Sequence, residues 1–290
     1  MSEELRYDDR VAIVTGAGSG LGRAHARLLA ARGAAVVVND VDRPGEDGRT
    51  PAAAACEQIT AEGGAAIPFD ASIAEPGAGA EAVETALKAF GRVDMVVNNA
   101  GIVRDRSFAK MSEEELRAVL DVHLLGSYRL TQAAWPHLVE RQYGRVVMTT
   151  SVAGLFGNFG QANYSAAKAG LVGLGRTLAI EGARKNIKVN IVSPGAATDM
   201  TSAALPAELH AAMSPDRVAQ LVGYLCHESC ATTGEIFFAA AGNYARNLII
   251  QTAGYRNPDA TVEDIAANLG RIMDTAEWTV PTDALAAPEV

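Results

Sequence analysis

The sequence is poor in cysteine and contains no long apolar run. Its 290 residues include three cysteines, Cys56, Cys226 and Cys230, an odd number at irregular spacing. Small secreted domains held together by disulfides carry even, closely spaced sets, so a reducing, cytoplasmic location is expected instead. No stretch reaches about 18 uninterrupted apolar residues, and the first ten residues lack the apolar segment of a secretory signal. We therefore expect neither a membrane span nor a signal peptide.

Positive charge is also scarce. There are 25 basic and 34 acidic residues, which gives a formal net charge of −9. Nucleic acids and anionic membranes are bound through clustered basic side chains, so neither is expected as a partner. Apolar residues, in contrast, make up 49% of the chain. That fraction supplies a large core and excludes a disordered chain.

Few residues are placed to bind a metal ion. Cys226, His227 and Cys230 fall within five residues of one another. A structural zinc site normally takes four ligands, however, and no second pair of Cys or His residues stands nearby. No metal is expected.

Short β-branched apolar runs alternate with longer helical stretches. Continuous apolar character is typical of strands covered on both faces, and the intervening helices allow the crossovers of a parallel sheet. The runs are 11–14, 36–38, 65–69, 95–97, 146–148, 189–192 and 236–238. They predict an α/β fold, a three-layer sandwich with a seven-stranded parallel sheet. Ser112, with Glu115 three residues later, predicts the start of one helix.

A glycine-rich turn, residues 15–22, follows the first predicted strand and precedes a helical segment. Glycines let the main chain approach a pyrophosphate closely, and a helix N-terminus favours an anion. Strand, turn and helix in this order, with an acid after the second strand, predict a dinucleotide site. The residues of the turn assigned to this site are Gly16, Ser19, Gly20, Leu21 and Gly22.

The acid is Asp40, 18 residues after Gly22. Its carboxylate could accept hydrogen bonds from the adenosine ribose and would repel a 2′-phosphate, so NAD is favoured over NADP. Asn39 and Arg43 could soften this preference. Asp70, followed by Ala71, closes the third strand and is a candidate contact for adenine, although such an Asp can also simply form a turn.

Three polar residues predict the reaction. Tyr164 and Lys168, four residues apart, share one face of a helix, and Ser151 ends an apolar strand, at the edge of a parallel sheet where ligands bind. A phenol is a poor base at neutral pH unless positive charge stabilises its phenolate, and Lys168 and an oxidised nicotinamide would both supply such charge. We predict that Tyr164 takes the proton of a substrate hydroxyl while Ser151 hydrogen-bonds the substrate oxygen. In reduction the roles reverse.

Together with Asn98-Asn99-Ala100-Gly101, these motifs resemble the short-chain dehydrogenase/reductase family, in order and spacing, over residues 8–242. The resemblance implies a single Rossmann-type NAD(P)-binding domain, residues 1–290, with a core at 8–242 and a C-terminal extension at 243–290. It also implies a homodimer or homotetramer. The further cofactor contacts that it implies are Asn99, Ala100, Gly101, Tyr164 and Lys168.

The turn Ser193-Pro194-Gly195 also matches the family and implies cofactor contacts by Pro194, Gly195 and Ala196. The family's Thr five residues after the Pro is Asp199 here. Thr198 or Thr201 could replace it as a partner for the nicotinamide carboxamide or a phosphate, and we favour Thr198.

A second departure from the family is His123, which stands where many members have a catalytic Asn. We include it among the catalytic candidates with two interpretations. Either a buried, neutral ring leaves the main-chain carbonyl to hold a water linked to Lys168, or the ring titrates as a proton relay.

Three further segments resemble one particular branch of this family. Residues 104–108, 157–164 and 225–230 resemble the (3R)-hydroxyacyl-CoA dehydrogenase parts of peroxisomal multifunctional β-oxidation proteins, which are also linked to 17β-hydroxysteroids. The resemblance implies an NAD-dependent oxidoreductase of lipid metabolism acting on CH–OH groups, with a 3-hydroxyacyl-CoA or a hydroxysteroid as substrate. Arg104 and Arg106 could meet CoA phosphates or be solvated. The alternatives are an NADPH-dependent 3-ketoacyl reductase of fatty-acid synthesis and a non-catalytic nucleotide-binding sensor.

Overall fold

The structure is a computed structural model that describes residues 4–41, 44–45, 48–198 and 207–284. Its main sheet has the strand order β3-β2-β1-β4-β5-β6-β7-β8. The strands are β1 (Val11–Thr15), β2 (Ala35–Asp40), β3 (Ala65–Asp70), β4 (Met95–Asn98), β5 (Gly144–Thr149), β6 (Ile187–Gly195), β7 (Ile236–Ala240) and β8 (Asn243–Asn247). The first seven pair in parallel, in the order of a doubly wound dinucleotide-binding sheet. The predicted fold class is confirmed.

The eighth strand was not predicted. Ala241 and Gly242, which connect β7 to β8, have φ angles of 51° and 80°. Positive φ at both central residues is the geometry of a tight hairpin turn. β8 is mostly exposed and has no apolar run, so it lacks the signal that reveals the seven parallel strands.

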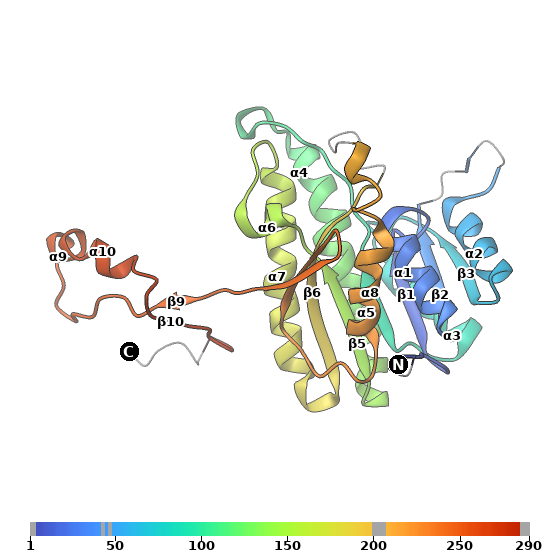
Figure 1. Cartoon of the computed structure of the whole chain (residues 1–290). Helices are drawn as coiled ribbons and strands as arrows, with labels where there is room; N and C mark the ends of the chain where they lie inside the picture. The colour runs from blue at the N-terminus through green and yellow to red at the C-terminus, as the bar shows by residue number, and fades with distance from the viewer. Residues whose placement is uncertain (1–3, 42–43, 46–47, 199–206, 285–290) are drawn as a thin grey trace. The chain divides into compact units, whose positions relative to one another are not determined.

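Helices cover both faces of the sheet (Figure 1). They are α1 (Gly20–Ala31), α2 (Pro51–Ala61), α3 (Ala78–Phe90), α4 (Glu113–Leu120), α5 (Gly126–Arg141), α6 (Val152–Phe156), α7 (Ala162–Gly182) and α8 (Pro215–Cys226). The single-turn helices of this part are η1 (Phe108–Lys110), η3 (Ala183–Lys185) and η5 (Ala207–Leu209). α4 begins at the predicted Ser112, whose side chain forms a capping box with Glu115.

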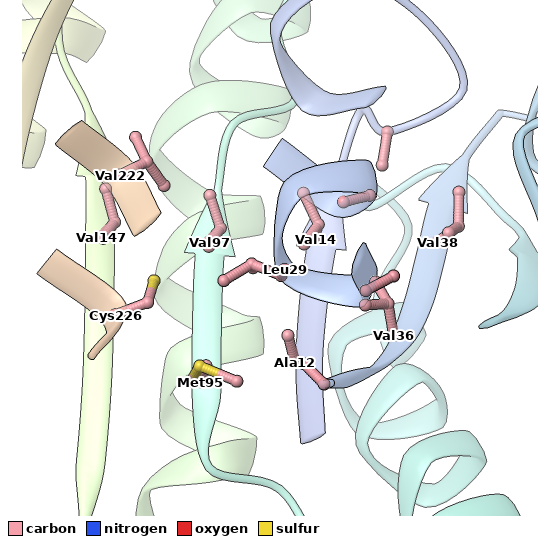
Figure 2. Packing of buried hydrophobic residues seen from close by; sticks show 14 of the residues in the cluster. Ala12, Val14, Leu29, Val36, Val38, Met95, Val97, Val147, Val222 and Cys226 are labelled. Carbon is pink, nitrogen blue, oxygen red and sulfur yellow. The ribbon is translucent and has the colours of Figure 1, made fainter. Parts of the chain in front are cut away.

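Alternate residues of the strands point into two different core clusters. Ala12 and Val14 of β1 pack into the first, which α1, α2 and α8 cover. Figure 2 shows Leu29 of α1 and Val222 of α8 against the strands of this cluster. Ile13 packs into the second, which α3, α5 and α7 cover. The strands are thus apolar on both faces, which explains their continuous apolar runs.

The helix after β4 changes its winding at a functional candidate. Between α4 and α5, residues Asp121–Leu125 form a π-helical turn (η2) with His123 at its centre. Such turns insert a residue into a helix and are frequent at functional sites. Nothing in the local sequence pattern predicted this one.

The chain divides into two compact units, Met1–Arg246 and Asn247–Val290. The second contains β9 (Gln251–Thr252), α9 (Val262–Ala267), α10 (Leu269–Ile272) and β10 (Trp278–Thr279), with β9 and β10 antiparallel. The boundary lies four residues beyond the core expected from the resemblance, and the count of one domain stays a prediction. In the described part of the chain, no helix is both long enough and apolar enough to span a membrane.

Candidate active site

The glycine turn is held tightly against the end of β4. The side-chain amide of Asn99 donates to the carbonyl oxygens of Thr15 and Gly16, at 2.9 and 3.2 Å. The hydroxyl of Thr15 in turn accepts from the main-chain N–H groups of Asn99 and Ala100, both at 3.0 Å. Asn99 and Ala100 therefore lie beside the turn, and their contact with a cofactor stays a prediction.

Glycine is required within this turn. A Cβ at Gly22 would lie 2.1 Å from the carbonyl oxygen of Gly16, and Gly16 itself has a φ of 62°. Ser19, just before α1, is exposed and its side chain makes no capping bond. The close packing of the turn and the helix start that follows fit a bound pyrophosphate.

Two carboxylates stand at adjacent strand ends beside the turn. Asp40 pairs in register with Asp70. One Asp40 oxygen accepts from the N–H of Gly18 at 2.8 Å, and the other accepts from Val41 at 2.8 Å. The buried Asn39 donates to the carbonyl oxygens of Phe69 and Ala71, which ties the end of β3 to β2. Asp40 therefore places negative charge next to the glycine turn. Arg43 lies outside the described residues.

Ser151, Tyr164 and Lys168 come together where β5 ends. Ser151 precedes α6 and caps it, accepting from the N–H of Ala153 at 3.2 Å. The Lys168 ammonium donates to the carbonyl oxygen of Thr149 at 2.5 Å and lies 5.6 Å from the centre of the Tyr164 ring. The predicted helix α7 thus brings the Lys168 ammonium to the end of β5, where it contacts Thr149, two residues before Ser151.

Burial acts on both ionisable groups of this set. It lowers the pKa of the Lys168 ammonium to about 7 and raises the pKa of the Tyr164 phenol. A hydrogen bond with Ser151 opposes the rise at Tyr164. The charge of Asp105 raises the pKa of Tyr164 further, and the charge of Lys168 is not among the causes of the shift, so the expected lowering of the phenol pKa by Lys168 is not found within the chain alone. A phenolate here needs further positive charge.

His123 is buried and contacts the catalytic candidates through its ring. The imidazole packs edge-on against Tyr164, and its Nε2 lies 2.8 Å from the carbonyl oxygen and 3.0 Å from the amide nitrogen of Ile102. Burial, and then the charge of Lys168, lower the pKa of His123 to about 3. The main-chain carbonyl of His123 accepts from Ser127 at 2.6 Å. These observations favour a neutral ring over a titrating relay.

Asn163 is a positioning residue that the sequence prediction missed. It is fully buried, and its amide donates to the carbonyl oxygens of Arg104 and Glu115, at 3.0 and 3.2 Å. Its side-chain oxygen accepts from the N–H of Tyr164 at 2.7 Å. Asn163 thus anchors the start of α7 directly before the phenol. An Asn next to the Tyr is the only local signal for this role.

The turn after β6 lies beside the glycine turn. A Cβ at Gly20 would lie 3.2 Å from the Cγ2 of Thr198, so Thr198 is placed next to the start of α1. Pro194 and Gly195 are at the end of β6, and Ala196 is buried. Asp199 and Thr201 lie outside the described residues. The choice of Thr198 as a cofactor contact stays a prediction.

The two arginines considered for CoA are exposed, but neither side chain is unpartnered. Arg106 forms an ion pair with Glu115 at 2.8 Å, and Arg104 donates to the carbonyl oxygen of Val103 at 2.7 Å. Their role toward a substrate stays a prediction.

Comparison with known families now adds to this geometry. The family model of the short chain dehydrogenases matches residues 10–208. The chain belongs to the short-chain dehydrogenase family. The resemblance drawn from the motifs is confirmed. The members of this family are oxidoreductases that use a nicotinamide dinucleotide, and the turn, Asp40 and Thr198 fit such a cofactor.

Two relatives of this short-chain dehydrogenase are peroxisomal multifunctional enzymes type 2. The Drosophila melanogaster enzyme is 52% identical over 82% of the chain, and the Mus musculus enzyme is 46% identical over 97%. The chain covers 40% and 39% of the length of these two enzymes.

A short chain dehydrogenase from Mycobacterium avium has a solved crystal structure that is 38% identical and superposes with a TM-score of 0.82. The match covers 93% of this chain and 98% of that one. The protein thus shares both the fold and nearly the whole length of that dehydrogenase.

Proposed function

We propose that this short-chain dehydrogenase transfers a hydride between NAD and the C3 alcohol or ketone of an acyl-CoA. The observation that carries the proposal is the convergence of Ser151, Tyr164 and Lys168 at the end of β5, next to a glycine turn with an acid beside it. The relatives named above support the class of substrate.

Ser151, Tyr164 and Lys168 have separate roles in the oxidation of the alcohol. Ser151 donates a hydrogen bond to the substrate oxygen and holds it beside the phenol of Tyr164. Tyr164 takes the hydroxyl proton as the C–H hydride leaves the carbon, and the carbinol becomes a ketone. A bound oxidised nicotinamide would supply the hydride acceptor and a positive charge near the phenol. Lys168 adds a second positive charge when protonated.

His123 and Asn163 act indirectly in this scheme. The edge of the His123 ring holds the phenol ring, and Asn163 holds the backbone of Tyr164. We therefore assign His123 as a positioning residue and not as a group that exchanges protons with the substrate.

NAD is the proposed cofactor because of Asp40. Its carboxylate lies beside Gly18 and would repel the 2′-phosphate of NADP, while it could accept bonds from an unmodified ribose. The same charge argues against an NADPH-dependent ketoacyl reductase.

Initial rates test the proposal directly. The (3R)- and (3S)-hydroxyacyl-CoA isomers and a 17β-hydroxysteroid are offered in parallel, each with NAD and with NADP, at a pH of about 8. Turnover of a hydroxyacyl-CoA with NAD is expected, and Tyr164→Phe should abolish it while NAD binding stays measurable. Turnover of the steroid alone would overturn the acyl-CoA assignment, and full activity of Tyr164→Phe would overturn the phenol as base.

We also propose that the protein is a homodimer or homotetramer. The C-terminal unit exposes large apolar side chains, among them Val262 at 81% and Met273 at 69%. Such side chains are usually covered in a stable assembly. Light scattering on the full chain should give a mass of two or four subunits, and a monomeric mass at micromolar concentration would contradict this.

The cytoplasm is the proposed location, on the cysteine pattern alone. The two multifunctional relatives are peroxisomal by name. Cell fractionation in which the chain sediments with a peroxisomal marker would overturn the proposal.

A further inference from the structure

The loop after β4 lies against the segment that begins α7 (Figure 1). Three consecutive residues of this loop, 104–106, each form a hydrogen bond with residues 160–163. The bonds join Arg104 to Asn163 at 3.0 Å, Asp105 to Gln161 at 2.9 Å and Arg106 to Gly160 at 2.8 Å. Of the three, the middle bond joins two side chains, and its acceptor is a carboxylate. Such charge-assisted bonds are stronger than bonds between neutral groups.

Gln161 is oriented by both ends of its side chain. It stands at the N-cap position of α7, but its side chain does not cap the helix. Its Nε2 donates to Asp105 instead, and its Oε1 accepts from the side-chain amide of Asn158 at 2.9 Å. A carboxylate can only accept, so the amide must turn its N–H group toward Asp105. Tyr164 follows three residues later on the same helix.

The carboxylate of Asp105 keeps its charge in this arrangement. Of the two neighbouring arginines, Arg106 forms an ion pair with Glu115, and Arg104 donates to the carbonyl oxygen of Val103. The amide of Gln161 is neutral. The bond from Gln161 therefore holds the carboxylate in place without cancelling its charge.

Groups from several elements act on the phenol of Tyr164 in the part of the chain that the structure describes. The Lys168 ammonium of α7 lies 5.6 Å from the ring centre, and the neutral His123 ring of η2 packs against it edge-on. Burial raises the pKa of the phenol, a hydrogen bond with Ser151 opposes this rise, and the charge of Asp105 adds to it. Asp105 thus supplies negative charge to the surroundings of the phenol.

We propose that Gln161 and Asp105 form a clasp that positions the phenol of Tyr164. The clasp ties the loop after β4 to the start of α7, and it holds a carboxylate where its charge acts on the phenol. Gln161 and Asp105 are thus positioning residues, which set the orientation of the base and the pH range in which it takes a proton. The inference rests on the proposed function for the role of Tyr164 as base.

Moving the charge from one partner to the other tests the clasp. Gln161→Glu keeps the acceptor for Asn158 but places a second carboxylate against Asp105, so repulsion replaces the bond. We expect kcat to fall about tenfold, the effect of one lost charge-assisted hydrogen bond, while the Kd for NAD stays unchanged. Adding Asp105→Asn supplies a new donor and should recover most of kcat. A combined variant no faster than Gln161→Glu alone would overturn the clasp.

The pH dependence of kcat separates the charge from the bond. Asp105→Asn alone keeps an oxygen that can accept from Gln161 but removes the charge, which lowers the pKa of the phenol. The phenolate is the active form in alcohol oxidation, so the rate should rise at lower pH than in the parent chain. The combined variant carries the charge at position 161, and its profile should return toward that of the parent. An unmoved profile in Asp105→Asn would overturn the action of this charge on the phenol.

A matched control is available on α2. Gln58 donates to the carboxylate of Glu62 at 3.2 Å, so Gln58→Glu makes the same chemical change at a second pair. α2 packs on β2 and β3, at one edge of the sheet. Gln58→Glu should leave kcat and its pH dependence unchanged. A loss of kcat equal to that of Gln161→Glu would show a general effect of facing carboxylates and overturn the clasp.

Hydrogen exchange detects the clasp without turnover. The N–H of Arg106 donates to Gly160, next to the clasp, so opening of the clasp exposes this amide to water. Exchange over residues 104–108 should be faster in Gln161→Glu and return toward the parent's rate in the combined variant. If no substrate is turned over, the proposed function fails, yet hydrogen exchange still decides the clasp. Exchange that is restored without any recovery of kcat would overturn the positioning of Tyr164.

Discussion

The imidazole of His123 meets the phenol of Tyr164 edge to face, with the ring centres 5.1 Å apart and the planes at 89°. The contact joins the π-helical turn to the start of α7. Gly101 makes space for it, because a Cβ at that position would lie 2.3 Å from the Cε1 of His123. Gly101 thus leaves room for the His123 ring, and that ring packs against Tyr164, the proposed base.

This pair predicts a coupled effect of two substitutions. Gly101→Ala should displace the His123 ring, lower kcat and reduce the free energy of unfolding by about 1–3 kcal/mol, because an added methyl forces a packed core to shift. His123→Asn in the same chain should restore part of both losses, since the smaller side chain removes the clash. A double-mutant cycle of kcat and stability measures the coupling. Additive effects would show that the two residues do not act as a pair.

A positioning role for His123 makes a separate prediction about pH. The lowered pKa of its ring, about 3, keeps it neutral near neutral pH. His123→Asn should therefore change kcat without moving the pH dependence of the rate between pH 5 and 8. A shift of the acidic side of the pH–rate profile in this variant would instead support the interpretation of His123 as a titrating proton relay.

Lys168→Met should remove activity and increase stability at low pH. The folded chain releases the Lys168 proton near pH 7, whereas the unfolded chain keeps it up to the usual value of 10.5. The unfolded state thus binds more protons between these values, so the stability of the parent chain rises with pH there. At pH 6 the removal of the buried charge should stabilise the variant by on the order of a few kcal/mol. The lost hydrogen bond to Thr149 should reduce this gain by about 1 kcal/mol.

Chemical denaturation of Lys168→Met across pH 6–10 measures this gain, which should shrink as the pH approaches 10.5. Lys88→Met is the control, because Lys88 is 73% exposed and carries no burial penalty. If the free energy of unfolding changed with pH in the same way in both variants, burial would not destabilise the Lys168 ammonium.

Two replacements of Asp40 separate its charge from its hydrogen bond. Asp40→Asn keeps an oxygen that can accept from Gly18 and removes the charge, whereas Asp40→Ala removes both. If charge sets the cofactor preference, both variants should lower the ratio of kcat/KM for NAD to that for NADP by about tenfold or more, which is about 1.4 kcal/mol. A change in Asp40→Ala alone would assign the preference to the hydrogen bond, and no change in either would remove Asp40 from the ribose contact.

The same substitution, Gly to Ala, is expected to have opposite effects at two positions. Gly22→Ala places a methyl 2.1 Å from the Gly16 oxygen and should distort the turn and abolish dinucleotide binding. Gly173, on α7, has open space around it. Gly173→Ala should stabilise the protein by about 1 kcal/mol through helix propensity. Thermal unfolding and NAD titration of the two variants check this contrast, and a destabilised Gly173→Ala would reveal a covered helix face.

Local sequence determined the seven parallel strands, the glycine turn and the spacing of Ser151, Tyr164 and Lys168. Each depends on neighbouring residues: apolar runs for strands covered on both faces, glycines for a turn that packs against its own helix, and a four-residue spacing for one helix face. These parts were predictable because the physical cause lies within a few residues of the effect.

Tertiary contacts decided the rest. The exposed strand β8 has no apolar run to reveal it, and the π-helical turn depends on how the helix packs. Asn163 anchors Tyr164 by binding the carbonyl of Arg104, 59 residues away in sequence, and Lys168 is buried against Thr149. The neutral ring of His123 and the lowered pKa of Lys168 follow from burial, which arises only when distant segments pack together and exclude water.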